Sequence, residues 1–167
     1  MIRTGIPAER GTYVLVLACG QAGRLRVGRL GSLDLRRGFY LYVGSALGPG
    51  GLAARLAHHC RIAKRPHWHV DYLRAAGELI EVWYATGAAR REHQWAGTVA
   101  RLPGATLPMP GFGSSGCPCR AHLFWFQRRP SIIAFNVRCE PPLQGGLQTQ
   151  RAHSPEPACT RNVAHRH

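Results

Sequence analysis

Two tyrosines, an arginine and a carboxylate follow one another along the chain in an order that suits phosphodiester hydrolysis. Tyr13 begins an apolar segment, Tyr42 ends a later one, and Arg55 and Glu92 lie in segments with helical spacing. A carboxylate can hold a divalent metal ion, a tyrosine can activate water, and an arginine can neutralise the charge that develops on a phosphate. We therefore expect a hydrolytic site if the fold brings the four side chains to one face.

Each of these residues also has a plainer structural explanation. A tyrosine in a strand can bury its ring in the core while its hydroxyl stays near water. Arg55 could be a solvated helix residue, and Glu92 could be favoured by the helix dipole because it lies near a helix start. Glu78 and Glu81 compete with Glu92 for the role of the carboxylate.

Cys117, Cys119 and His122 form a second group with the chemistry of a metal site. A structural zinc site normally has four protein ligands, so a fourth would have to come from elsewhere in the chain. The candidates for it are Cys60, His59, His67 and His69. Because the two cysteines are closer together than in most structural zinc sites, the alternative is that Cys117 and His122 brace their loop by hydrogen bonds.

The formal net charge of the chain is +14, from 22 Lys and Arg against 8 Asp and Glu. Lys64 is the only lysine. Arginine can hold a phosphate through two hydrogen bonds, and a basic excess favours polyanions such as DNA or RNA, with salt-dependent binding. The alternative is a GC-rich genome that encodes arginine wherever a solvated cation suffices.

Several polar residues are candidates for contacts to nucleic acid, DNA more than RNA. The Gly- and Ser-rich segment 111–117 could cradle a phosphate with its backbone N–H groups. For the histidines of segment 67–73 we favour a structural or DNA-contacting role over metal ligation. The predicted nucleic-acid-binding residues are Arg61, Lys64, His67, His69, Ser114 and Ser115.

Hydrophobic periodicity gives the elements that must position these side chains. Strands are expected at residues 12–18, 24–30, 33–35, 38–44, 79–86 and 123–126, and helices at 52–63, 67–77 and 88–102. The strand at 24–30 is expected to pair back on the first strand. This order predicts an α/β, mixed α+β fold, in which helices cover a small sheet and a hairpin at 23–36 is added.

The composition changes after residue 126, where apolar residues become rare and Pro, Gln, Arg and His become common. We expect one domain over residues 1–126 and a basic, disordered or loosely packed tail over 127–167, with one further strand at 131–137. The chain has no run of 18 apolar residues, which predicts no membrane span, and its six cysteines do not resemble a disulfide framework. A cytoplasmic location follows as an expectation.

The sequence resembles the GIY-YIG nuclease superfamily. Gly11-Thr12-Tyr13 and Tyr42-Val43-Gly44 match the two motifs that name it. The match is closer to a subfamily of short, stand-alone proteins of unknown function, which share HWHVDYL at 67–73 and a segment similar to GFGSSGCPCRAHLF at 111–124. The resemblance covers about residues 10–126.

The resemblance implies a small, mostly antiparallel central sheet flanked by helices. It also implies a repair-associated, metal-dependent endonuclease acting on DNA, with Mg²⁺ or Mn²⁺ held by Glu92. The active-site residues that it implies are Tyr13, Tyr42, Arg55, His59 and Glu92. The chain departs from the subfamily at Gly116, where an aspartate is expected. Two alternatives therefore stay open: a non-catalytic nucleic-acid-binding module on the same fold, and a zinc-stabilised interaction domain.

Overall fold

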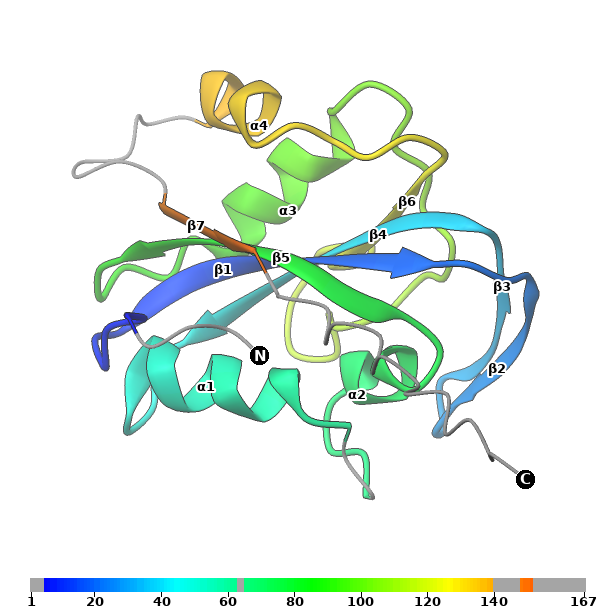
Figure 1. Cartoon of the computed structure of the whole chain (residues 1–167), viewed down its shortest axis with the longest axis horizontal. Helices are drawn as coiled ribbons and strands as arrows, with labels where there is room; N and C mark the ends of the chain where they lie inside the picture. The colour runs from blue at the N-terminus through cyan, green and yellow to red at the C-terminus, as the bar shows by residue number, and fades with distance from the viewer. Residues whose placement is uncertain (1–4, 63–64, 140–147, 152–167) are drawn as a thin grey trace, which may run out of the picture.

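The computed structural model describes residues 5–62, 65–139 and 148–151. In this part of the chain, five antiparallel strands form the main sheet in the order β6-β4-β1-β5-β7, and β2 and β3 form a separate small sheet (Figure 1). The strands are β1 Gly11–Cys19, β2 Gly23–Val27, β3 Gly31–Leu35, β4 Gly38–Ala46, β5 Glu78–Thr86, β6 Leu123–Phe126 and β7 Gln148–Arg151. The helices are α1 Gly51–Cys60, α2 His69–Arg74, α3 Glu92–Ala100 and α4 Ile132–Arg138. The predicted mixed α+β class is confirmed.

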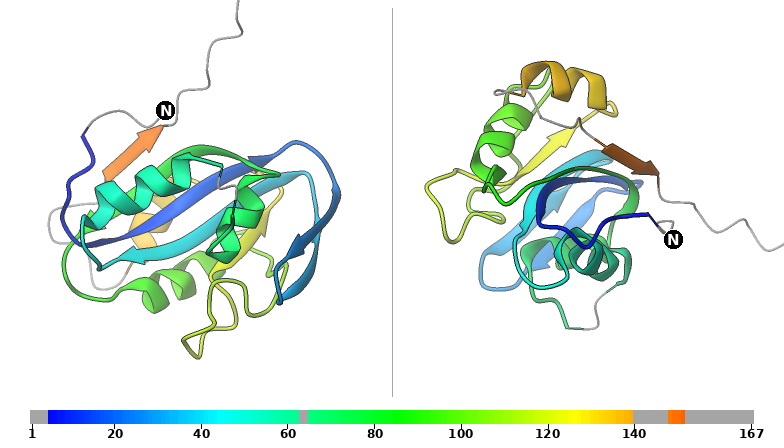
Figure 2. Two further views of the ribbon diagram at one scale, coloured as in Figure 1. Left: turned by 90° about the horizontal axis from the view of Figure 1, so that it is seen from below. Right: turned by 90° about the vertical axis from the view of Figure 1, so that its left-hand side faces the viewer.

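Helices cover both faces of the main sheet, with α1 and α2 on one face and α3 and α4 on the other (Figure 2). The central strand β1 is apolar from Val14 to Leu17 because both of its faces are buried. Tyr13, Leu15 and Leu17 pack toward α1 and α2, whereas Val14 and Val16 pack toward α3 and α4. A strand that is buried on both faces favours apolar side chains along most of its length.

The β2–β3 hairpin lies beyond one end of the main sheet, at the right of Figure 1. The predicted pairing of residues 24–30 with the first strand is wrong, because β2 pairs only with β3 among the described strands. The physical reason is that both edges of β1 are already occupied, one by β4 and the other by β5.

Residues 131–137 were predicted as a strand, and this prediction is wrong. Ile132–Arg138 is helix α4, and the hydroxyl of Ser131 caps it by accepting a hydrogen bond from the backbone N–H of Ile133 at 3.1 Å. The buried Phe135 packs 5.5 Å from Trp83 and 5.2 Å from Trp95, measured between ring centroids. The packed structure therefore continues past residue 126 as far as Cys139, while residues 140–147 and 152–167 of the predicted tail lie outside the described residues.

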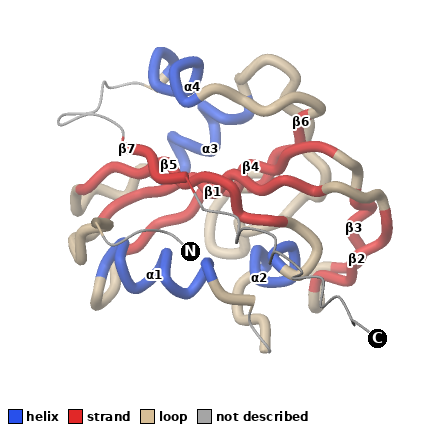
Figure 3. The backbone as a smooth tube through the Cα atoms, in the orientation of Figure 1, coloured by secondary structure: helices blue, strands red, loops and turns tan. Residues whose placement is uncertain are grey.

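The helices are short. The longest one described, α1, has 10 residues, and no described helix is long and apolar enough to cross a bilayer. A long stretch without regular structure joins α3 to β6, drawn in tan in Figure 3. It carries the Gly- and Ser-rich segment and the free cysteines Cys117 and Cys119, and it meets β4 where the N–H of Val43 donates to the carbonyl of His122.

Candidate active site

The two predicted tyrosines lie on the same face of adjacent strands, next to α1. Tyr13 on β1 is opposite Gly44 on β4, and Tyr42 is opposite Leu15. A Cβ atom on Gly44 would lie 2.5 Å from the hydroxyl of Tyr13, so only glycine at this position lets the ring lie over the backbone of β4. Tyr42 is covered in turn by the loop glycine Gly113, whose φ of +75° also favours glycine.

The charges of Arg55 and Glu92 shift the pKa of both tyrosines, so the four predicted residues form one electrostatic cluster. Burial raises the pKa of Tyr13 well above its usual value; the neighbouring Tyr42 and Glu92 raise it further, and Arg55 lowers it. Burial also raises the pKa of Tyr42, with Glu92 and Arg55 acting in the same opposed directions. Both hydroxyls are therefore protonated near neutral pH.

Tyr13 has a partner that can take its proton. Its hydroxyl oxygen lies 2.8 Å from Nε2 of His59, and both side chains are 1% exposed. Burial lowers the pKa of His59, against the opposing effect of Asp71, so the imidazole is neutral near pH 7. Nδ1 of His59 faces Oδ1 of Asp71 at 3.7 Å, which favours the proton on Nδ1 and leaves Nε2 free to accept.

Asp71 is held in place by the turn that precedes α2. Its Oδ2 accepts hydrogen bonds from the backbone N–H groups of His67 at 2.8 Å and Trp68 at 3.0 Å, and its Oδ1 lies 3.2 Å from Nε2 of His58. Burial alone would raise the pKa of Asp71, but these contacts and His59 hold it well below its usual value. A buried, ionised carboxylate therefore stands behind the His59–Tyr13 pair.

Arg55 lies between the buried side chains of Tyr13, His59 and Asp71 and an open pocket. Its guanidinium lies over the ring of Trp68, 4.3 Å from the centroid, and it lines a pocket of about 300 Å³ together with His58 and Arg61. Two arginines and an aromatic ring in one concave surface form a site suited to a phosphate beside a base or sugar.

Glu92 reaches the same cluster from the other side of the sheet. β6 pairs with β4 only as far as Tyr42, so β6 does not cover the edge of β4 beyond that residue. Ser45 lies in this last part of β4 and donates a hydrogen bond to Oε2 of Glu92. Oε1 of Glu92 lies 3.2 Å from Nδ1 of His122, and the side chain is 20% exposed. Burial raises the pKa of Glu92, but His122 and Ser45 outweigh burial, so the net shift is downward.

The predicted nucleic-acid-binding residues lie in different surroundings, and only some of them are exposed. Arg61 and His67 are exposed beside the pocket, and Ser115 is exposed on the loop. His69 instead has a structural contact, because its Nδ1 accepts a hydrogen bond from the backbone N–H of Gly113 at 2.9 Å. Ser114 is buried, and Lys64 lies outside the described residues.

The departure at Gly116 lies on the loop just before Cys117. Gly116 is exposed, and a Cβ atom built on it would have no neighbour within 4 Å. The position therefore has room for the first atom of a larger side chain.

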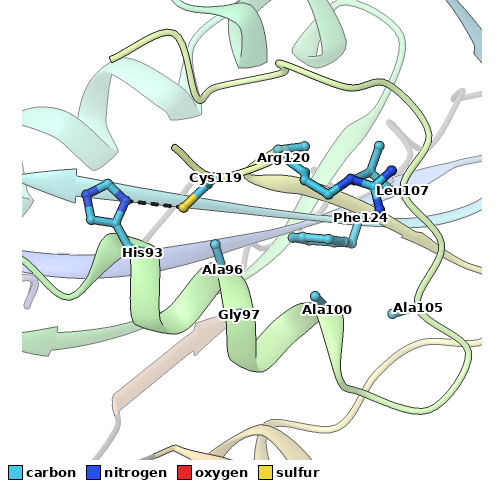
Figure 4. Close-up of a pocket in the computed structure, with 10 residues that line it drawn as sticks. His93, Ala96, Gly97, Ala100, Ala105, Leu107, Cys119, Arg120 and Phe124 are labelled. Carbon is cyan, nitrogen blue, oxygen red and sulfur yellow. Dashed lines mark hydrogen bonds between the residues drawn. The ribbon is translucent and has the colours of Figure 1, made fainter. Parts of the chain in front are cut away.

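The described residues include two groups that could hold a metal ion. One consists of His58, His59 and Asp71, and the other of His93, Cys117, Cys119 and His122. His93 was not among the predicted candidates for a fourth ligand. It lies on α3, with Nδ1 3.3 Å from Sγ of Cys119 at one end of a pocket of about 360 Å³ that none of the predicted catalytic residues lines (Figure 4).

Sequence reasoning missed three contributors to these sites: Ser45, His93 and the link from Asp71 to His59. Each acts across a contact between elements that are distant in the sequence. Asp71 contacts two histidines of α1, His58 and His59, which precede it by more than ten residues.

Comparison with known proteins places the chain in a family. No curated protein and no solved structure matches it. One family model matches residues 12–141, and its description is "Domain of unknown function DUF123". The matched region includes Tyr13, Tyr42, Arg55, His59 and Glu92, as well as both metal-binding groups. The chain belongs to the DUF123 family.

Proposed function

We propose that this protein is a GIY-YIG-type, metal-dependent endonuclease that hydrolyses phosphodiester bonds in DNA. The observation that carries the proposal is the 2.8 Å contact between the Tyr13 hydroxyl and Nε2 of His59, backed by Asp71. Tyr42, Arg55 and Glu92 each influence the pKa of the same hydroxyl, and these residue types are the ones that phosphodiester hydrolysis requires.

The proton path starts at the attacking water. The water gives a proton to the Tyr13 oxygen as the hydroxyl passes its own proton to Nε2 of His59. His59 becomes an imidazolium, and the carboxylate of Asp71 stabilises that charge. The raised pKa of Tyr13 makes this acceptor necessary, because a protonated tyrosine cannot act as a base alone.

Arg55 and the pocket supply the binding of the phosphate. Arg55 can hold a non-bridging oxygen and neutralise the charge that develops there. Arg61 extends the same cationic surface along the backbone of the nucleic acid, and Trp68 holds the Arg55 guanidinium in the pocket.

The donor chemistry of Glu92 fits a hard divalent cation such as Mg²⁺ or Mn²⁺. A carboxylate offers about four lone-pair directions, and Ser45 and His122 each take one of them. Its lowered pKa keeps it ionised, and Mg²⁺ commonly binds through one or two carboxylates plus waters and phosphate oxygens. When bound, the ion would stabilise charge on the phosphate and on the leaving oxygen.

Cleavage of single-stranded, duplex and branched DNA in Mg²⁺ or Mn²⁺ tests the proposal. We expect wild type to cut at least one of these substrates and Glu92→Gln to lose at least about 100-fold in rate, the loss typical of removing one electrostatic group. Glu78→Gln is the matched control, because Glu78 is an exposed acid at the start of β5. Cleavage by Glu92→Gln at the wild-type rate would reject the role of Glu92.

Gly116 favours a second candidate function, a nucleic-acid-binding module without turnover. The position accepts a larger side chain, so Gly116→Asp restores the residue that the resembling proteins carry. Binding without cleavage by wild type, followed by cleavage in Gly116→Asp, would support this alternative over the first.

A further inference from the structure

We propose that His93, Cys117, Cys119 and His122 bind a structural zinc ion. Their ligand atoms all lie within 4.8 Å of one another. Two thiols and two imidazoles are a ligand set that Zn²⁺ prefers, and four protein ligands leave no open position for substrate, which is the mark of a structural site.

The spacing of these ligand atoms is close to that of a tetrahedral zinc site. Zinc–sulfur bonds of about 2.3 Å and zinc–nitrogen bonds of about 2.0–2.1 Å place neighbouring ligand atoms roughly 3.3–3.8 Å apart. Sγ of Cys117 lies 3.3 Å from Nε2 of His122, and Sγ of Cys119 lies 3.3 Å from Nδ1 of His93. Each sulfur is therefore already at ligand spacing from one nitrogen, and inward shifts of roughly 1 Å bring the widest pairs to the same spacing.

The carboxylate behind His122 is an independent sign of metal binding. Metal-bound histidines usually donate their second N–H to a carboxylate, which sets the tautomer and the ring orientation. Nδ1 of His122 lies 3.2 Å from Oε1 of Glu92, so Nε2 is left with its lone pair facing Cys117. His122 is 1% exposed, so protein atoms enclose its ring.

The site also has a structural task. Cys117, Cys119 and His122 lie on the irregular stretch between α3 and β6, which is drawn in tan in Figure 3. His93 lies in the first turn of α3 and faces Cys119 (Figure 4). Zinc would join that stretch to the helix. Because Glu92 precedes His93 and contacts His122, the same ion would hold Glu92 in position at the end of β4.

The second group of possible ligands does not have these properties. Nε2 of His59 faces the Tyr13 hydroxyl, and Oδ2 of Asp71 accepts two backbone hydrogen bonds. These atoms are engaged in the proton path, so we assign no metal to His58, His59 and Asp71.

Metal analysis of the full chain tests the zinc site without any nucleic acid, so its outcome is independent of the nuclease proposal. The protein is produced without a polyhistidine tag and purified without chelator. We expect about one zinc per chain, and at least a tenfold lower content in a Cys117→Ser/Cys119→Ser double variant. Cys60→Ser is the matched control and keeps its zinc, because Cys60 lies on α1.

Two further measurements use the wild-type protein alone, so they do not depend on whether a variant folds. Replacement of zinc by Co²⁺ should give the visible absorption of a tetrahedral, thiolate-bound ion. Removal of zinc by a strong chelator should lower Tm by about 5–10 °C, and added zinc should restore it. Two results would overturn the assignment in favour of a metal-free loop. One is less than one zinc per several chains together with a Tm that chelator does not change. The other is a Cys117–Cys119 disulfide in fresh protein.

Discussion

At the scale of single residues, the Tyr13–His59 pair decides how the site could work. A buried tyrosine with a raised pKa needs a neutral acceptor, and a buried histidine with a lowered pKa is one. The types and order of Tyr13, Tyr42, Arg55 and His59 were visible in the sequence. The contacts of Asp71 with His59 and of Ser45 with Glu92 were not visible, because they join elements that are distant in the chain.

The pH profile of cleavage should report the protonation state of His59. The pKa of His59 is lowered from 6.5, chiefly by burial, so the neutral acceptor persists below the pH at which a free histidine becomes charged. As pH falls, we expect kcat/KM to drop with a midpoint below 6.5, and to stay level from there to pH 8.

The same shift makes a prediction about stability. Between its lowered folded pKa and its unfolded value of 6.5, the unfolded chain binds more protons at His59 than the folded chain does. The contribution of His59 to the free energy of unfolding is therefore present above pH 6.5 and is lost as pH falls through that window.

A kcat/KM midpoint above pH 7 that persists in His58→Gln would contradict this account of His59.

At the scale of elements, the strand pairing β1–β4 builds the site, and Gly44 is its tightest point. Gly44→Ala would place Cβ 2.5 Å from the Tyr13 hydroxyl and 2.6 Å from Cζ. We expect it to lower the free energy of unfolding by about 1–3 kcal/mol, the usual cost of overpacking, and to displace the Tyr13 ring from His59. Chemical denaturation measures the first effect and the rate of cleavage the second.

Gly23→Ala is the matched control for that substitution. Gly23 is also a strand glycine without positive φ, and a Cβ on it has no neighbour within 4 Å. Equal stability of the Gly44→Ala and Gly23→Ala variants would show that the ring of Tyr13 does not need the space above Gly44.

Most elements could be predicted from sequence periodicity, and the errors have physical causes. β1 and β6 follow from continuous apolar runs bounded by turn residues. The partner of β2 could not be predicted, because periodicity does not reveal that β4 and β5 occupy both edges of β1. Residues 131–137 form a short apolar run whose length suits a strand or a helix, and only the packing of Phe135 against Trp83 and Trp95 distinguishes them.

At the scale of the whole molecule, the net charge of +14 should dominate association with nucleic acid. The affinity for duplex DNA should fall linearly with salt on a double-logarithmic plot. Arg55→Ala/Arg61→Ala should weaken binding and reduce the slope by about 2, because each phosphate contact contributes about 0.9. Fluorescence anisotropy across a salt series measures both quantities.

Arg138→Ala serves as the reference for that series. Arg138 is exposed on α4, which covers the opposite face of the sheet from α1 (Figure 2). We expect its slope to match wild type. An unchanged slope in the Arg55→Ala/Arg61→Ala variant would move the DNA-binding surface away from the pocket.

The most direct test of the proposed active site is single-turnover cleavage by Tyr13→Phe, with DNA binding measured in parallel. This change removes one hydroxyl and its contact with His59, and keeps the buried ring. We predict a rate lower by about 10²–10⁴-fold with unchanged affinity, whereas Tyr72→Phe, a tyrosine on α2 outside the cluster, cleaves as wild type does. A Tyr13→Phe variant that folds, binds DNA and cleaves at the wild-type rate would contradict the proposal.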